Sequence, residues 1–128
     1  AGTVKPDLAV VVDVTYCTDY PYGYSVKEAG EVKLGAGPVL CNSPLIPSQL
    51  NRQAEKIAAR RGIPVQYETA SRLTCTDADK IHFENGGTPV ILVSIPLRYM
   101  HSPAEVADER DVEGCIGLVA GILEEFEL

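Results

Sequence analysis

Two unbroken aliphatic runs constrain the fold of this chain most strongly: DLAVVVDV at residues 7–14 and TPVILVSIP at residues 88–96. A strand with one face in water alternates apolar and polar residues, whereas a strand covered on both faces does not. We therefore predict that both runs are buried strands of a sheet, with other elements packed over them.

Turn-forming residues divide the rest of the chain. Residues 15–37 mix Tyr, Gly and Pro without periodicity, which predicts a long irregular connection after the first strand. Shorter apolar stretches at 37–42 and 63–70 are two further strand candidates.

Three segments have the signals of helices. The first opens at Pro47 and Ser48 and stops at Gly62. The second is capped by Thr76 and ends at the Gly86–Gly87 pair. The third is expected to bury one apolar face over four turns, made of Val112, Cys115, Ile116, Val119, Ile122, Leu123 and Phe126.

Strands that alternate with helices are typical of α/β proteins, in which parallel strands are joined by right-handed crossovers. The chain has 128 residues, of which 45% are hydrophobic, and this is enough for one core. No repeat or composition change marks a boundary. We predict a single α/β unit over residues 1–128 with a mainly parallel sheet.

Charge and cysteine usage exclude several classes of protein. The formal net charge of −7 argues against a nucleic-acid surface, because such surfaces neutralise phosphates with Lys and Arg. No apolar run reaches the ~20 residues of a membrane span, and the amino terminus has no signal-peptide layout. The four cysteines form no close pair, so we expect thiols of a reducing cytoplasm rather than a zinc or redox motif.

Polar groups follow three of the predicted strands. Because parallel strands end at one edge of a sheet, side chains placed there are expected to converge. Aspartate and histidine without a nearby nucleophile favour a metal site, since both are standard zinc ligands. The candidates are Asp13, Thr15 and Asp19 after the first strand, Thr76 and Asp77 after the third, and His101 after the fourth.

Each candidate also has a structural interpretation. Asp13 could cap a turn at a strand end, and Asp77 could be an ordinary residue of a helix start. His101 could be a solvated loop residue in front of a capping box at residues 102–105. His82 lies in an amphipathic helix, where packing is the more usual role of a histidine.

Two other kinds of site lack support. LGAGPV, at residues 34–39, has neither the second half of GxGxxG nor the GK[ST] of a P-loop, so its glycines are expected to form a turn. No GxSxG is present, and no cysteine has a base nearby in the sequence. Nucleophilic catalysis is therefore not indicated.

Four segments together resemble a family of cytosolic metallopeptidases, the glutamyl and tetrahedral aminopeptidases, whose members are often named endoglucanase or deblocking aminopeptidase. KPDLAVVVDVTYCTDYPYG resembles the family's D-V-T-x-A-x-D-x-P-G segment, and GEVKLGAGPVL its KLGKGP segment. CTDADKIH resembles the GTDA motif, and IPLRYMHSPAEVADERDVE the closing signature. The four occur in the family's order and cover nearly the whole chain.

The resemblance implies a zinc-exopeptidase-like fold and an enzyme that removes amino-terminal residues from peptides with two metal ions, zinc or cobalt. It assigns Asp13 as a ligand of one metal and His101 as a ligand of the other. The family's remaining ligands and its general base lie upstream of the matching segment. The resemblance therefore implies the carboxyl-terminal part of a catalytic domain, from a parent enzyme that assembles as a homo-oligomer.

The chain departs from the family pattern at two motifs. Cys75 stands where GTDA has its glycine, which puts the turn before Thr76 in doubt. Tyr22 intervenes between Pro21 and Gly23. Neither departure removes an assigned ligand.

One ligand for each metal is fewer than the about three that a catalytic zinc takes. We therefore expect weak metal retention and no turnover by the chain alone. A non-catalytic α/β module that binds partners or assembles remains an alternative, and a flavodoxin-like ligand-binding domain is a weaker one. If the sheet is part of a larger one, apolar surface next to the first strand is expected to be exposed, with self-association as a consequence.

Overall fold

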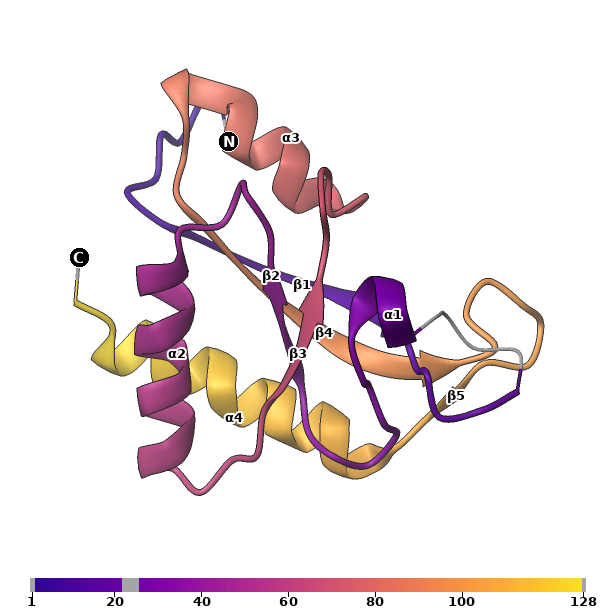
Figure 1. Cartoon of the computed structure of the whole chain (residues 1–128). Coiled ribbons are helices and arrows are strands. Elements are labelled where there is room, and N and C mark those ends of the chain that lie inside the picture. The colour runs from indigo at the N-terminus through magenta and orange to yellow at the C-terminus, as the bar shows by residue number, and fades with distance from the viewer. Residues whose placement is uncertain (1, 22–25, 128) are drawn as a thin grey trace.

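The computed structural model describes residues 2–21 and 26–127, so that Tyr22 and Gly23 lie outside the described residues. Five strands and four α-helices follow one another along the chain (Figure 1). In order they are β1 (Ala9–Tyr16), α1 (Val26–Ala29), β2 (Val39–Asn42), α2 (Ser48–Arg60), β3 (Gln66–Thr69), α3 (Asp77–Phe83), a 3₁₀ turn (Glu84–Gly86), β4 (Val90–Arg98), β5 (Val106–Ala107) and α4 (Glu109–Glu125).

The strands form one sheet in the order β1-β4-β2-β3, with β5 paired to the end of β4. β1 runs parallel to β4 over eight residue pairs, in which Asp13 lies opposite Ser94, and β2 runs parallel to β3. β2 and β4 are antiparallel. The predicted α/β class with a mainly parallel sheet is confirmed, but the two central strands run in opposite directions.

The opposite direction of β2 has a simple cause in the connections. Only α2, between β2 and β3, forms a helical crossover between two consecutive parallel strands. Antiparallel strands begin at the end of the sheet where their neighbour finishes, and so need no crossover. The segments from β1 to β2 and from β3 to β4 each join strands of opposite direction that have one other strand between them in the sheet. The sequence predicted β1 to β4 and α2 to α4, but not α1, which lies in the connection predicted to be irregular, nor β5, nor which connections cross the sheet.

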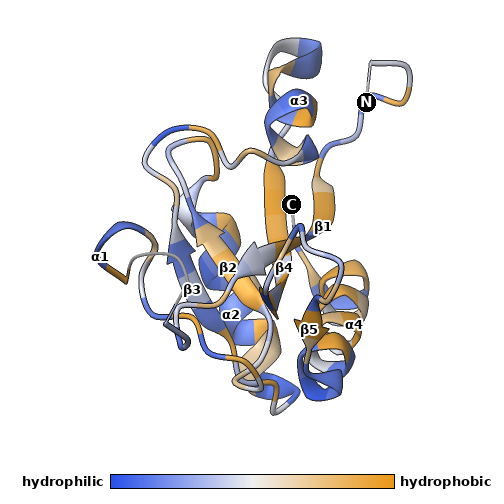
Figure 2. Ribbon diagram, turned by 90° about the vertical axis from the view of Figure 1, so that its right-hand side faces the viewer, coloured by the Kyte–Doolittle hydropathy of each residue, from blue (hydrophilic) through white to orange (hydrophobic). Residues whose placement is uncertain are grey.

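Helices cover the two faces of the sheet unequally. α2 and α4 pack against one face, where Leu40, Ile91 and Val93 meet Ile57 and Leu118 (Figure 1). α3 covers part of the other face in a smaller cluster that includes Val11, Cys41, Leu92 and Ala78. Figure 2 shows the hydrophobic colouring of β1 and β4 between these layers.

The apolar face predicted for α4 is partly wrong. Leu118 is fully buried against the sheet, whereas Ile116 and Leu123 are 65% and 75% exposed. Residues at spacings of three and four form one stripe along a helix, and α4 has two such stripes. The stripe with Cys115, Leu118 and Ile122 packs on the core, and the one with Ile116 and Leu123 faces outward.

β1 lies at an edge of the sheet. β4 is its only neighbour among the described residues, and Val12 is 50% exposed. No helix in the described part of the chain combines the length and the apolarity that crossing a bilayer requires. All four cysteines are free, and Cys17, Cys41 and Cys115 are buried.

The glycines of LGAGPV form a loop held by a helix, as expected for a turn. Asp111, in the first turn of α4, is fully buried, and its two carboxylate oxygens accept hydrogen bonds from the amides of Gly35 and Gly37, each at 2.7 Å. These amides therefore point at a side chain of the protein and not at solvent.

Candidate functional site

A cavity of about 630 Å³ opens over the face of the sheet that carries α3. It contains Asp13, Thr15, Thr76 and His101, which come from three separate segments. The remaining lining residues are Val14, Tyr16, Glu28, Ala29, Cys41, Glu68, Thr69, Ala70, Ser71, Leu73, Thr74, Cys75 and Met100.

The candidates meet on a face of the sheet and not, as predicted, at the edge where parallel strands end. Side chains alternate between faces along a strand, so Asp13 and Thr15 share the face of Val11. Val11 lies under α3, while Asp13 and Thr15 line the open cavity. Because β2 and β3 run against β4, their carboxyl ends point back toward α3.

Asp13 lies within β1 and not at its end, since the strand continues to Tyr16. Its side chain is half-buried, and Oδ1 accepts a hydrogen bond of 2.8 Å from the amide of Val14. The interpretation of Asp13 as a cap of a turn after the strand is therefore wrong.

His101 occupies a turn after β4 with a left-handed backbone (φ 64°). Its ring packs edge to face against Tyr16, with 6.2 Å between ring centroids. Its amide donates to Glu105 Oε1 at 2.6 Å. No helix begins at Ser102, so the predicted capping box is wrong, and Glu105 instead closes the turn that carries the histidine.

The segment before α3 contributes one side of the cavity. Thr76 caps α3 as predicted, accepting a hydrogen bond from the amide of Ala78. Cys75 adopts φ 60°, the left-handed region that glycine favours, so the backbone at this position has a conformation that suits a glycine. Asp79, which the sequence did not single out, is buried and accepts hydrogen bonds from the amides of Thr74 and Cys75.

Three other candidates do not line the cavity. Asp77 is exposed in the first turn of α3 and pairs with Lys80, which supports its interpretation as a helix-start residue. His82 is half-buried, with Nδ1 3.1 Å from the carbonyl oxygen of Thr88. Asp19 forms a two-bond ion pair with Arg98, which lowers the pKa of the Asp19 carboxyl.

Glu68 is the cavity residue that sequence reasoning missed. It projects from β3, and both of its oxygens accept hydroxyl hydrogen bonds: Oε2 from Thr15 and Oε1 from Ser94, the latter at 3.4 Å. Burial raises the pKa of Glu68, the two hydroxyls lower it, and the charge of Asp13 raises it further, with a net rise. A single glutamate in a four-residue strand carries no sequence signal for this role.

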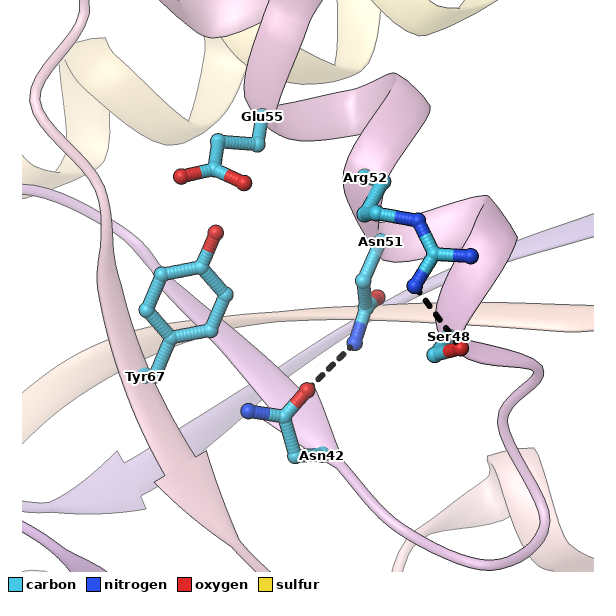
Figure 3. A pocket seen from close by; sticks show the side chains of 6 residues that line it. All are labelled: Asn42, Ser48, Asn51, Arg52, Glu55 and Tyr67. Atoms are coloured by element: carbon cyan, nitrogen blue, oxygen red, sulfur yellow. Dashed lines mark hydrogen bonds between the residues drawn. The ribbon is translucent and has the colours of Figure 1, made fainter.

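A second cavity, of about 290 Å³, lies between α2 and strands β2 and β3 (Figure 3). It is lined by Asn42, Ser48, Asn51, Arg52, Glu55 and Tyr67. The Asn51 amide donates to the carbonyl oxygen of Cys41 and to Asn42 Oδ1, which fastens α2 to the end of β2. This cavity contains no residue that the sequence marked as a candidate.

The acid response of the Asp19–Arg98 pair is testable. Because the pKa of Asp19 is lower in the folded protein than the value of about 3.9 in the unfolded chain, its ionised carboxylate stabilises the fold at pH values above 3.9. This stabilisation is lost as the pH falls through the pKa of Asp19 in the folded protein. We expect Asp19→Asn to lower the free energy of unfolding by about 1–2 kcal/mol at pH 7, and by much less near pH 2. Urea unfolding at pH 7, 4 and 2 measures this, with Asp7→Asn, at an exposed site, as control. A deficit independent of pH would contradict the assignment.

The chemistry of the cavity fits a divalent cation, because a carboxylate and an imidazole are both zinc ligands. Within the described residues, no three His, Cys, Asp or Glu side chains lie close enough together to hold a metal ion. Asp13 and His101 therefore offer two ligand groups, and a complete site requires more.

The known proteins that this chain resembles in sequence and in structure include several aminopeptidases. The model of the M42 glutamyl aminopeptidase family matches residues 1–118. A lysyl aminopeptidase of Pyrococcus furiosus is 35% identical over 126 residues, which are 97% of this chain and 35% of that protein. A TET aminopeptidase from a marine sediment archaeon of the Thaumarchaeota has a TM-score of 0.84 and 31% identity, over 98% of this chain and 35% of that one.

A third relative is the TET1 peptidase of Pyrococcus horikoshii, with a TM-score of 0.71 and 25% identity over 95% of this chain and 34% of that one. The chain spans about a third of the length of these relatives. The family model covers most of the chain, and the fold of the solved relatives is the one described above. The chain belongs to the M42 glutamyl aminopeptidase family.

Proposed function

We propose that this chain is the carboxyl-terminal part of a metal-dependent aminopeptidase, to which it contributes Asp13 and His101 as ligands of two divalent cations, zinc or cobalt. The observation that carries the proposal is that these two side chains, remote in sequence, line one cavity. The name of the Pyrococcus furiosus relative, lysyl aminopeptidase, supports the reaction class.

When bound, paired cations lower the pKa of a water molecule and polarise the carbonyl group that it attacks. The residues of this chain orient the site. The backbone amide of Val14 donates a hydrogen bond to Asp13 Oδ1, and we assign Oδ2 as the atom that binds a cation. Tyr16 and the Glu105 contact fix the turn of His101. Apolar lining from Leu73 and Met100 would exclude water from around a bound peptide end.

The remaining ligands and the general base are assigned to the rest of the parent protein, so we propose that the chain alone is inactive on peptides. The parent protein is proposed to be a homo-oligomer, because the Pyrococcus horikoshii relative is described as assembling into a tetrahedron or an octahedral shell. The four free cysteines support a cytoplasmic location.

Binding of Co²⁺ to the 128-residue chain tests the ligand assignment. We expect weak but saturable binding of two Co²⁺ ions, and Asp13→Asn and His101→Gln should each weaken the binding of one of them by at least about tenfold, since each removes the ligand that the chain gives to that cation. His82→Gln is the matched control, because His82 lies outside the cavity, and its affinity should equal that of the unchanged chain. Equal losses in all three variants would contradict the assignment.

A non-catalytic module that assembles with other copies is a second candidate. The exposed apolar side chains of Val12, Ile116 and Leu123 favour it. Sedimentation of the chain across a wide concentration range tests this candidate. Assembly without Co²⁺ binding would favour the module, and Co²⁺ binding that depends on Asp13 and His101 would favour the enzyme part.

A further inference from the structure

Glu68 lines the same cavity as the proposed ligands Asp13 and His101. Its side chain reaches from β3 across β2 to hydroxyls on two other strands, Thr15 on β1 and Ser94 on β4. Ser94 is the direct partner of Asp13 in the β1–β4 ladder, and Thr15 is the next residue on the same face of β1. One carboxylate therefore links β3 to β1 and β4, and it forms part of the floor of the cavity that Asp13 also lines.

The charged side chains that line the cavity are predominantly acidic. Its lining contains the carboxylates of Asp13, Glu28 and Glu68, and neither lysine nor arginine is among the described residues that line it. Ser94 is almost fully buried and Glu68 is half-buried, so this floor is only partly screened by solvent. Carboxylates held together in a partly desolvated cavity repel one another and attract a cation more strongly than exposed ones do.

We propose that Glu68 is a positioning residue of the cation site: it accepts the Thr15 and Ser94 hydroxyls beneath Asp13, stays out of the coordination shell, and raises the affinity of Asp13 and His101 for a divalent cation through its negative charge. This inference rests on the proposed function. Within the described residues, no three His, Cys, Asp or Glu side chains could hold one metal ion together, and both oxygens of Glu68 accept hydroxyl hydrogen bonds, which favours the role of a neighbouring charge over that of a ligand.

Glu68→Gln tests the charge at nearly constant shape. With Co²⁺ as the probe and the whole 128-residue chain as the protein, we expect the dissociation constant to rise about 3–10-fold at low salt. The increase should shrink at higher ionic strength, because salt screens the charge. The wavelengths of the visible Co²⁺ absorption bands should not change, since the coordinating atoms are the same.

Glu109→Gln is the matched control. Glu109 is exposed in the first turn of α4 and does not line the cavity, so the loss of its charge should change the dissociation constant less than twofold. Ser94→Ala is a second variant that keeps the charge of Glu68 while removing its 3.4 Å bond, and it should also stay within about twofold. Thermal unfolding of each variant verifies that binding is measured on folded protein.

Three results would overturn the inference. If Glu68→Gln binds Co²⁺ with unchanged affinity, the charge of Glu68 has no role in binding. If the Co²⁺ absorption bands of this variant shift, Glu68 is a ligand instead. An equal loss in Ser94→Ala makes the hydrogen bond, and not the charge, responsible. In each case Asp13→Asn and His101→Gln still weaken binding. If those two variants bind Co²⁺ normally, the proposed function itself is wrong, and the two failures are thereby distinguished.

Discussion

Replacing Gly37 with alanine is expected to lower the free energy of unfolding by more than about 3 kcal/mol. The backbone of Gly37 has φ 102°, a conformation that side chains with a Cβ rarely adopt. An added Cβ would overlap the carbonyl oxygen of Pro64 and lie 2.8 Å from its carbonyl carbon.

The atoms that an added Cβ at Gly37 would overlap belong to the backbone of Pro64, and hydrogen bonds hold the segments on both sides in place. The Gly37 amide donates to Asp111, and the Gly37 carbonyl accepts from the Gln66 side chain at 2.8 Å. The adjacent Pro38 carbonyl accepts from the amide of Gln66 at 2.9 Å. Relief of the clash would therefore separate the loop from the start of β3. Neither side can move without loss of these hydrogen bonds.

Gly62→Ala is the matched control for this prediction. Gly62 also has a positive φ, of 67°, but an added Cβ there meets nothing within 4 Å. Its expected cost is the left-handed conformation alone, about 1 kcal/mol. Urea unfolding followed by circular dichroism measures both variants. Similar losses at the two positions would show that steric overlap at Pro64 does not control the stability of the loop.

Asp111→Asn is expected to cost about 2–4 kcal/mol of the free energy of unfolding. The buried carboxylate accepts from two backbone amides at once and lies in the first turn of α4, where the helix dipole favours negative charge. An amide side chain has one oxygen and an NH₂ group, so one glycine amide would face a donor.

Hydrogen exchange gives this prediction a local readout. The amides of Gly35 and Gly37 should exchange faster in Asp111→Asn than in the unchanged chain, because their acceptor is weakened or lost. Glu109→Gln is the control, since Glu109 shares the first turn of α4 but is exposed, and it should change stability by less than about 0.5 kcal/mol. A neutral Asp111→Asn would contradict the assigned role of this residue.

The site was predictable in part from the sequence. Three residues that line the cavity were singled out from local signals: Asp13 in an aliphatic strand pattern, Thr76 as a helix cap, and His101 after a strand. Each also lies in a segment that resembles a motif of the family. Glu68 was missed because it acts through residues of β1 and β4 that are distant in sequence. The capping box at Ser102 was wrong because Glu105 bonds the His101 amide in a turn, and local spacing cannot distinguish the two uses.

By itself, the sequence determined the α/β class, the order of four strands and three helices, and the family, because periodicity, helix caps and motifs are written in neighbouring residues. Tertiary structure alone decided that β2 runs against β4, which stripe of α4 is buried, and which carboxylates lie on the face of Asp13. The physical reason is that a strand pattern specifies which side chains share a face, but not which distant strand lies beside them. The cavity is formed by those non-local neighbours, and so are its charge and its chemistry.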